Sequence, residues 1–230
     1  MSARGSQTAS EGGADLAARL RLHVLTDREW SRGRSTLEVA AAALDGGATV
    51  IQLRDKMATT RELVSVGLAL RKLTRARGAL LIVNDRVDVA LAVDADGAHV
   101  GQDDMPAARA RRLLGPLRLL GVSARTLAEA EAAIADEADY LGVGPIYATH
   151  GKADAGPPTG TDLLRAIVAR LGSSSVPLVA IGGITAANAG EVVRAGAAGV
   201  AVITAVVNAE DVAAAAHDLA ECVRAAHDTL

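Results

Sequence analysis

The feature that most constrains the fold is a short apolar run that recurs eight times along the chain. Each run is a few residues long and rich in Leu, Val, Ile and Ala, and almost every one carries polar residues or glycine where the apolar stretch stops. Such runs are typical of strands buried on both faces, as in a parallel sheet. The eight runs occupy residues 21–27, 49–56, 79–85, 97–102, 117–124, 140–145, 177–183 and 199–205.

Segments with helical spacing of apolar and charged residues separate these runs, for example 36–44, 60–76, 127–135 and 161–171. Strands that alternate with helices predict parallel pairing through right-handed crossovers. We therefore predict an α/β fold, a single-domain (β/α)8 TIM barrel over residues 15–230. N-cap candidates for the helices are Ser35, Thr60, Thr126 and Thr185.

The alternative architecture is an open, doubly wound sheet. Such folds often carry a G-x-G-x-x-G turn directly between the first strand and its helix, and none stands there in this chain. The count of eight units and the polar residues at the strand ends favour the barrel, whose active sites lie at the carboxyl ends of the strands.

Composition limits the class of protein. The 230 residues are 50% hydrophobic, which is ample for one core, and the net charge of −3 gives no reason to expect nucleic-acid binding. The single cysteine, Cys222, excludes an intramolecular disulfide and a cysteine-based zinc cluster. No apolar run approaches the ~20 residues that span a membrane.

Residues 1–14 are rich in Ser, Gly and Ala and lack the apolar segment of a secretory signal. We interpret them as a disordered tail and expect a cytoplasmic protein. The oligomeric state stays open, and a homo-oligomer is compatible with the sequence.

The second run, TVIQLRDK, begins with apolar residues and ends with polar and charged ones. Side chains on a strand alternate between faces, so Gln52, Arg54 and Lys56 are expected to point the same way. An amide and two cations on one face supply donors for phosphate oxygens. The alternative interpretation is an ordinary solvated strand end.

A second phosphate signal follows the seventh and eighth runs. Gly182 and Gly183 end the seventh run before a helix, and Ile203 and Thr204 end the eighth. Glycines let backbone N–H groups approach an anion, and many barrels hold a phosphate in these two loops. A tight turn without a ligand is the alternative.

Two carboxylates end neighbouring strands. Asp85 closes the third run and Asp104 follows the fourth, so both side chains could share one Mg²⁺ together with a substrate phosphate. Asp85 alone would more simply be a turn residue or helix cap. The two carboxylates and the donors of the second run together predict a metal-bound diphosphate site, and the glycine loop predicts a separate phosphate site. This layout suits an enzyme that joins two phosphorylated molecules.

The motifs QLRDK, VND, HVGQDD, GVSAR, YLGVGPIYAT, AIGGIT and VITA, in this order from Gln52 to Thr204, resemble the thiamine-phosphate synthase (thiamine-phosphate pyrophosphorylase) family. The resemblance implies a transferase that condenses hydroxymethylpyrimidine diphosphate with hydroxyethylthiazole phosphate, giving thiamine phosphate and diphosphate. It implies Mg²⁺ as cofactor and a dissociative, carbocation-like mechanism. Such chemistry needs stabilisation of the departing charge and exclusion of water rather than a nucleophile.

The resemblance also assigns roles to individual residues. The implied contacts are Gln52, Arg54, Lys56 and Asn84 to the pyrimidine diphosphate, Asp85 and Asp104 to Mg²⁺, Ser123 and Lys152 to the leaving diphosphate, and Thr149, Gly183, Ile203 and Thr204 to the thiazole phosphate.

The chain departs from the family pattern on the thiazole-phosphate side. Gly151 stands where well-known members carry a second Thr, and Thr204 stands where a Ser is usual. The Gly- and Pro-rich segment 149–160 is interpreted as a mobile lid that carries Lys152. His23 and His99 lie within strand runs, so we expect them to be packed or hydrogen-bonded rather than metal ligands.

Two alternative functions differ in the sites they need. A thiazole tautomerase-like enzyme would bind thiazole phosphate without a diphosphate and Mg²⁺ site, and retention of Asp85, Asp104, Arg54 and Lys152 argues against it. A non-catalytic regulatory barrel would keep the glycine loop and could lose the metal carboxylates.

Overall fold

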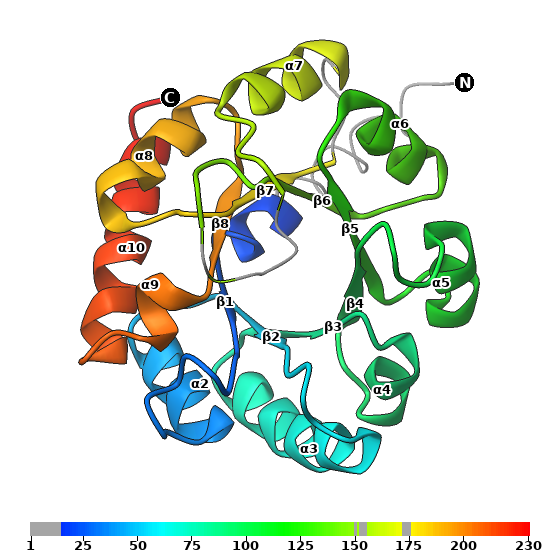
Figure 1. The fold of residues 1–230 in the computed structure, drawn as a ribbon, viewed down its shortest axis with the longest axis vertical. Helices are drawn as coiled ribbons and strands as arrows, with labels where there is room; N and C mark the ends of the chain where they lie inside the picture. The colour runs from blue at the N-terminus through cyan, green and yellow to red at the C-terminus, as the bar shows by residue number, and fades with distance from the viewer. Residues whose placement is uncertain (1–14, 150, 152–155, 172–175) are drawn as a thin grey trace, which may run out of the picture.

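Eight parallel strands close into one barrel in the computed structural model, which describes residues 15–149, 151, 156–171 and 176–230 (Figure 1). The expected disordered tail, residues 1–14, lies outside the described residues. The strands are β1 (Leu22–Leu25), β2 (Val50–Leu53), β3 (Leu80–Asn84), β4 (Gly97–Val100), β5 (Leu119–Ala124), β6 (Tyr140–Val143), β7 (Leu178–Ile181) and β8 (Gly199–Val202). The predicted (β/α)8 barrel is therefore confirmed.

Each strand pairs with its sequence neighbours, and β8 pairs with β1 through the register Leu22 opposite Val200. Almost every strand residue is buried, because one face fills the barrel and the other meets the helices. Leu53 lies on the outer face and packs against the helix α3 (Thr60–Ala76). The contact is close at Gly67, where an added Cβ would lie 3.4 Å from Leu53 Cδ2. Gln52 and Arg54 on the alternate positions therefore face the barrel interior.

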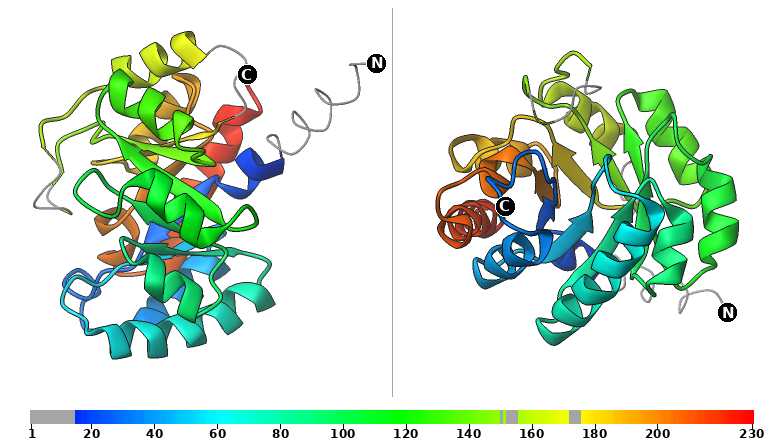
Figure 2. Two further views of the ribbon diagram at one scale, coloured as in Figure 1. Left: turned by 90° about the vertical axis from the view of Figure 1, so that its right-hand side faces the viewer. Right: turned by 60° about the horizontal axis from the view of Figure 1, so that its bottom comes forward.

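The labelled helices surround the strands on the outside, as the views in Figures 1 and 2 agree. The other helices are α2 (Thr36–Asp45), α4 (Val87–Ala92), α5 (Ala107–Leu114), α6 (Leu127–Ala135), α7 (Asp162–Leu171), α8 (Ala186–Arg194), α9 (Thr204–Val207) and α10 (Val212–His227). The C-terminal helix α10 packs against α8 on one side and α2 on the other. It thereby fills the place between the last and the first of the helices around the barrel. Within the described ranges, no helix is long and apolar enough to cross a membrane.

Helix starts follow the expected capping chemistry, with one correction. Ser35 caps α2 in a capping box, Thr126 caps α6, and Thr185 precedes α8. For α3 the prediction of Thr60 was wrong, because Thr59 is the cap. Thr59 has extended backbone angles and its hydroxyl accepts the N–H of the third helical residue, whereas Thr60 already has helical geometry.

Candidate active site

A cavity of about 580 Å³ opens at the carboxyl ends of the strands. This volume is in the range of small-molecule sites, and the position is the one that barrel enzymes use. Most of the residues predicted from sequence line this cavity. They are Arg54, Lys56, Asn84, Asp85, Asp104, Ser123, Thr149, Gly183, Ile203 and Thr204.

Two predicted residues are not among those that line the cavity. Gln52 is buried on β2 below Arg54 and does not line the cavity, so a direct contact between Gln52 and a ligand stays a prediction. Lys152 lies outside the described residues, as do residues 153–155.

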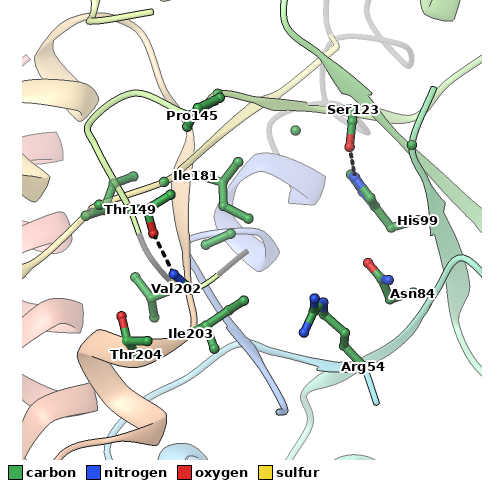
Figure 3. A pocket seen from close by; sticks show the side chains of 18 of the residues that line it. Arg54, Asn84, His99, Ser123, Pro145, Thr149, Ile181, Val202, Ile203 and Thr204 are labelled. Atoms are coloured by element: carbon green, nitrogen blue, oxygen red, sulfur yellow. Dashed lines mark hydrogen bonds between the residues drawn. The ribbon is translucent and has the colours of Figure 1, made fainter. Parts of the chain in front are cut away.

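The labelled side chains fall on two sides of the cavity (Figure 3). Arg54, Asn84, His99 and Ser123 lie on one side, and they come from strands β2 to β5 or the ends of those strands. The other side carries Thr149, Pro145, Ile181, Ile203 and Thr204, which come from the loops after β6 and β8 and from β7. One cavity thus has two chemically different sides.

Arg54 is held rigidly at the first side. Its guanidinium forms an ion pair with Asp27, and both side chains are about nine-tenths buried. Thr26 brackets the Arg54 backbone, because its Oγ1 donates to the Arg54 carbonyl and accepts the Arg54 N–H, both at 3.0 Å. Arg54 Nε is buried and has no hydrogen-bond partner among the described residues. A buried, oriented donor without a partner fits an anionic ligand.

The strand β2 ends at Leu53, so the alternation predicted for it does not extend to Lys56, which lies in the turn that follows. Lys56 lines the same cavity from an exposed position, so Arg54 and Lys56 do face one pocket. Asp55 points elsewhere and pairs with Arg28 at 2.9 Å.

Asp85 and Asp104 line the cavity together at the ends of β3 and β4. Asp85 has a φ of +64°, an uncommon backbone conformation for a residue other than glycine, and its N–H donates to the His99 carbonyl at 2.8 Å. Asp104 Oδ2 accepts the Gly101 N–H at 2.7 Å, which orients the carboxylate.

The donor set suits Mg²⁺. The part of the chain that the structure describes holds no cluster of three or more His, Cys, Asp or Glu residues able to bind a metal. Asp85 and Asp104 stay the predicted protein ligands of Mg²⁺, with water and substrate phosphate expected to complete the shell. Mg²⁺ is commonly bound in this way, through one or two carboxylates and phosphate oxygens.

Ser123 on β5 is hydrogen-bonded to His99 on β4, with 2.9 Å between Ser123 Oγ and His99 Nε2 (Figure 3). The other ring nitrogen, His99 Nδ1, lies 3.2 Å from the hydroxyl of Tyr140. The expectation that His99 is hydrogen-bonded is confirmed. His23 is packed instead: it is fully buried beside the Tyr140 ring, its Nε2 has no hydrogen-bond partner among the described residues, and desolvation lowers its pKa to about 3.

The second side of the cavity contains the glycine turn. Gly182 and Gly183 have φ of +99° and +64°, which glycine adopts at no steric cost. A Cβ on Gly183 would lie 2.5 Å from the Ala148 carbonyl oxygen, so the turn packs directly on the loop after β6. In that loop, Thr149 Oγ1 accepts the Gly151 N–H at 3.1 Å.

Thr204 begins the short helix α9 and lines the same cavity as this turn. Arg34 binds the other end of the helix, because its NH2 group donates to the carbonyls of Val207 and Ala209 at 2.9 and 2.7 Å. The loop after β1 that carries Arg34 also brings Trp30 to the cavity wall. These long-range contacts hold Ile203 and Thr204 in place from outside the cavity.

Sequence reasoning missed several residues of the site. Trp30, Arg125 and Gln102 line the cavity, and Asp27 orients Arg54. Asp27 carried a usable signal, since it is the polar residue that ends the first apolar run. Trp30 lies well inside a loop, where no periodicity indicates which way a side chain points.

Comparison with known proteins places this site in a family. Residues 22–206 match the family model described as thiamine monophosphate synthase. The thiamine-phosphate synthase of Chloroflexus aurantiacus is 62% identical over 86% of this chain and 90% of its own length. That of Moorella thermoacetica is 56% identical over 88% of this chain and 95% of its own length.

A solved structure agrees with the sequence comparisons. The thiamine phosphate pyrophosphorylase from Pyrococcus furiosus superposes with a TM-score of 0.84 and 45% identity, covering 92% of this chain and 98% of the other. The motif resemblance seen in the sequence is therefore confirmed across the whole barrel, and this chain belongs to the thiamine-phosphate synthase family.

Proposed function

We propose that this enzyme condenses hydroxymethylpyrimidine diphosphate with hydroxyethylthiazole phosphate to give thiamine phosphate and diphosphate. The observation that carries the proposal is the two-sided cavity. One side presents Arg54 and Asn84, and the other presents Ile203 and Thr204 at the start of α9 (Figure 3). The lining also includes Lys56, the carboxylates of Asp85 and Asp104, and the glycine turn. Each side suits one of the two phosphorylated substrates.

The pyrimidine diphosphate lies on the side of β2 to β5 in this proposal. Arg54 and Lys56 bind its phosphate oxygens, and Asn84 donates to the same substrate from the end of β3. Gln52, buried below Arg54, supports them from the barrel interior. The thiazole phosphate lies opposite, held by backbone donors near Gly183 and by Thr149, Ile203 and Thr204.

Asp85 and Asp104 would hold Mg²⁺ between them and the diphosphate. The bound ion would neutralise part of the negative charge that grows on the diphosphate as the bond to the pyrimidine methylene breaks. Ser123 and Lys152 donate to the same oxygens. The aminopyrimidine ring spreads the positive charge left on the methylene, and the thiazole nitrogen attacks it inside a cavity closed to water.

The direct test is formation of thiamine phosphate by the purified protein from the two purified substrates, with and without Mg²⁺. We expect product and diphosphate in equal amounts, dependent on Mg²⁺. A thiazole tautomerase-like enzyme would act on the thiazole substrate alone, and a regulatory barrel would bind it without forming product. Either result would contradict the proposal.

Lys152 offers a sharper test of the mechanism. Replacing a cation that stabilises the leaving group should slow cleavage in the transition state, while thiazole-phosphate binding stays unchanged. We expect Lys152→Ala to slow pyrimidine diphosphate cleavage at least ~100-fold in a single-turnover, rapid-quench measurement. Lys72→Ala, an exposed lysine on α3, is the matched control. Cleavage by Lys152→Ala at the parent rate would make Lys152 an ordinary loop residue.

A further inference from the structure

Three polar side chains form a chain of hydrogen bonds from the barrel interior to the cavity wall. Tyr140 on β6 contacts His99 on β4, and His99 contacts Ser123 on β5. Tyr140 is fully buried and does not line the cavity, whereas His99 and Ser123 do. Tyr140 is therefore linked to the site through His99.

The space for this chain is built by glycines on the adjacent strands. A Cβ on Gly121 would lie 2.2 Å from Tyr140 Cζ and 2.4 Å from His99 Nδ1. A Cβ on Gly142 would lie 2.8 Å from His99 Cε1. Because any side chain at these positions would collide with the rings, the rings have one closely defined placement.

Counting donors decides which ring nitrogen of His99 carries hydrogen in the neutral form. Burial raises the pKa of Tyr140, so the phenol keeps its proton at neutral pH. Among the described residues, the hydrogen-bond partner of this hydroxyl is His99 Nδ1. If Nδ1 carried hydrogen, the phenol proton would be left buried without an acceptor, which is costly.

With Tyr140 donating to Nδ1, the hydrogen of His99 lies on Nε2 and points at Ser123 Oγ. Ser123 Oγ then accepts from His99, so its own O–H is directed away from the ring. The Ser123 backbone is held as well, since Gln102 Nε2 donates to the Ser123 carbonyl at 2.6 Å. The hydroxyl is left as a donor at the wall of the cavity.

We propose that Tyr140 is a positioning residue, which through the tautomer of His99 makes Ser123 a hydrogen-bond donor to the leaving diphosphate. This inference rests on the role proposed above for Ser123. Tyr140 touches neither substrate, so its effect belongs to the cleavage step and not to the binding of either substrate.

The test compares Tyr140→Phe with Tyr147→Phe, the other tyrosine of the chain, whose hydroxyl donates to Glu191 on the protein surface. Tyr140→Phe keeps the ring and removes the donor. We expect single-turnover cleavage of the pyrimidine diphosphate to slow about 10-fold, the scale of one lost hydrogen bond, with unchanged affinity for both substrates. Tyr147→Phe should cleave at the parent rate.

A spectroscopic measurement separates positioning from general damage. In protein labelled with ¹⁵N-histidine, the His99 signals, identified by their loss in His99→Gln, should report hydrogen on Nε2 in the parent and in Tyr147→Phe. Tyr140→Phe should shift the population towards hydrogen on Nδ1, while circular dichroism stays that of the parent. A parent in which Nδ1 carries hydrogen would overturn the inference.

A double-variant cycle distinguishes failure of this inference from failure of the Ser123 role. If Tyr140 acts through Ser123, adding Tyr140→Phe to Ser123→Ala should slow cleavage by less than about 2-fold further. If the two substitutions instead slowed cleavage by independent factors that multiply in the double variant, Tyr140 would have a merely structural role. Should Ser123→Ala itself cleave at the parent rate, the role of Ser123 is wrong, and the positioning role falls with it.

Discussion

At the scale of single residues, the site depends on cations and carboxylates whose orientation is imposed by neighbours. Arg54 is bracketed by Thr26 and paired with Asp27, so its guanidinium keeps one orientation without a ligand. Preorganised charge of this kind costs little reorganisation when substrate binds.

Loss of the Arg54 guanidinium should therefore lower the catalytic efficiency strongly. We expect Arg54→Ala to lower kcat/KM by the equivalent of about 2–4 kcal/mol, because a fixed donor to the departing diphosphate disappears. Asp55→Ala is the matched control on the same strand end. Its partner Arg28 is more than half exposed, whereas Asp55 itself is about nine-tenths buried and also accepts the Met57 N–H, so the change should lower stability and leave kcat/KM nearly unchanged. Equal losses of kcat/KM in both variants would refute the assignment of Arg54.

The carboxylates can be tested with an isosteric change. Asp85→Asn and Asp104→Asn each remove one negative charge, and the amide oxygen introduced by the second change can still accept the Gly101 N–H. Calorimetry should show weaker Mg²⁺-dependent binding of the pyrimidine diphosphate by about 10- to 100-fold, with thiazole-phosphate binding nearly unchanged. Asp88→Asn, an exposed carboxylate paired with Arg86, should change neither. If binding of both substrates weakened equally, the variants would be misfolded, and the loss would not come from a missing metal ligand.

At the scale of elements, the loops after β6, β7 and β8 form one packed unit. The N–H groups of Ile146 and Tyr147 donate to the carbonyls of Ile181 and Gly182 at 2.9 and 3.0 Å. The glycine turn is thereby held against the loop that carries Thr149. Movement of any one of these loops would disturb the others.

Gly183→Ala should disrupt this unit. The substitution places a side chain at φ +64° and drives its Cβ against the Ala148 carbonyl, so the turn must move. We expect thiazole-phosphate affinity to fall about 10- to 100-fold, as for one or two lost charge-assisted hydrogen bonds. Binding of the pyrimidine diphosphate should change far less.

The control for this variant is Gly78→Ala at the end of α3. Gly78 also has a positive φ, +68°, but no atom lies within 4 Å of an added Cβ. It should cost about 1 kcal/mol of stability through backbone strain and leave ligand affinity intact. If the two variants weaken thiazole-phosphate binding equally, backbone strain alone accounts for the loss and the turn holds no phosphate.

At the scale of the whole molecule, the barrel interior contains a buried histidine that makes stability depend on pH. His23 is fully buried, and desolvation lowers its pKa from 6.5 to about 3. Below pH 6.5 the unfolded chain binds a proton at this residue that the folded chain does not bind. Stability is thus complete above pH 6.5 and is lost as the pH falls towards 3.

This linkage predicts a measurable loss of folding stability at acidic pH. Between pH 7 and pH 5, His23 alone should reduce the free energy of unfolding by about 2 kcal/mol. Urea denaturation of His23→Leu should show a correspondingly smaller loss over the same interval. His217→Gln, an exposed position on α10, should keep the pH dependence of the parent. An unchanged pH dependence in His23→Leu would show that other groups dominate.

Cytoplasmic localisation, the oligomeric state and the disordered tail stay predictions of the sequence. The chain belongs to a family of enzymes whose named members act in thiamine phosphate formation, so its expected partners are small molecules. The described helices contain no membrane span.

The sequence by itself determined the eight strands, their order and their alternation with helices, because hydrophobic period and capping chemistry act over a few residues. It did not predict the short helix α9, whose first residues fall within the eighth apolar run. It also placed the polar residues at the strand ends, where parallel strands must bring them to one mouth. Even the error at Thr60 was a shift by one residue, since Thr59 and Thr60 differ only in which hydroxyl meets the helix start.

Only the tertiary structure decided which of these side chains meet. Asp27 and Arg54 are 27 residues apart in sequence, His99 and Tyr140 are 41 apart, and Arg34 is 173 residues from Val207. These contacts depend on how closure of the barrel staggers each strand against the next, and that stagger sets the depth of every inward side chain. Gln52 lies on β2 and Arg54 follows just after the strand ends, on the same face, yet only Arg54 lines the cavity, because two residues of extended chain are a difference of about 7 Å in depth.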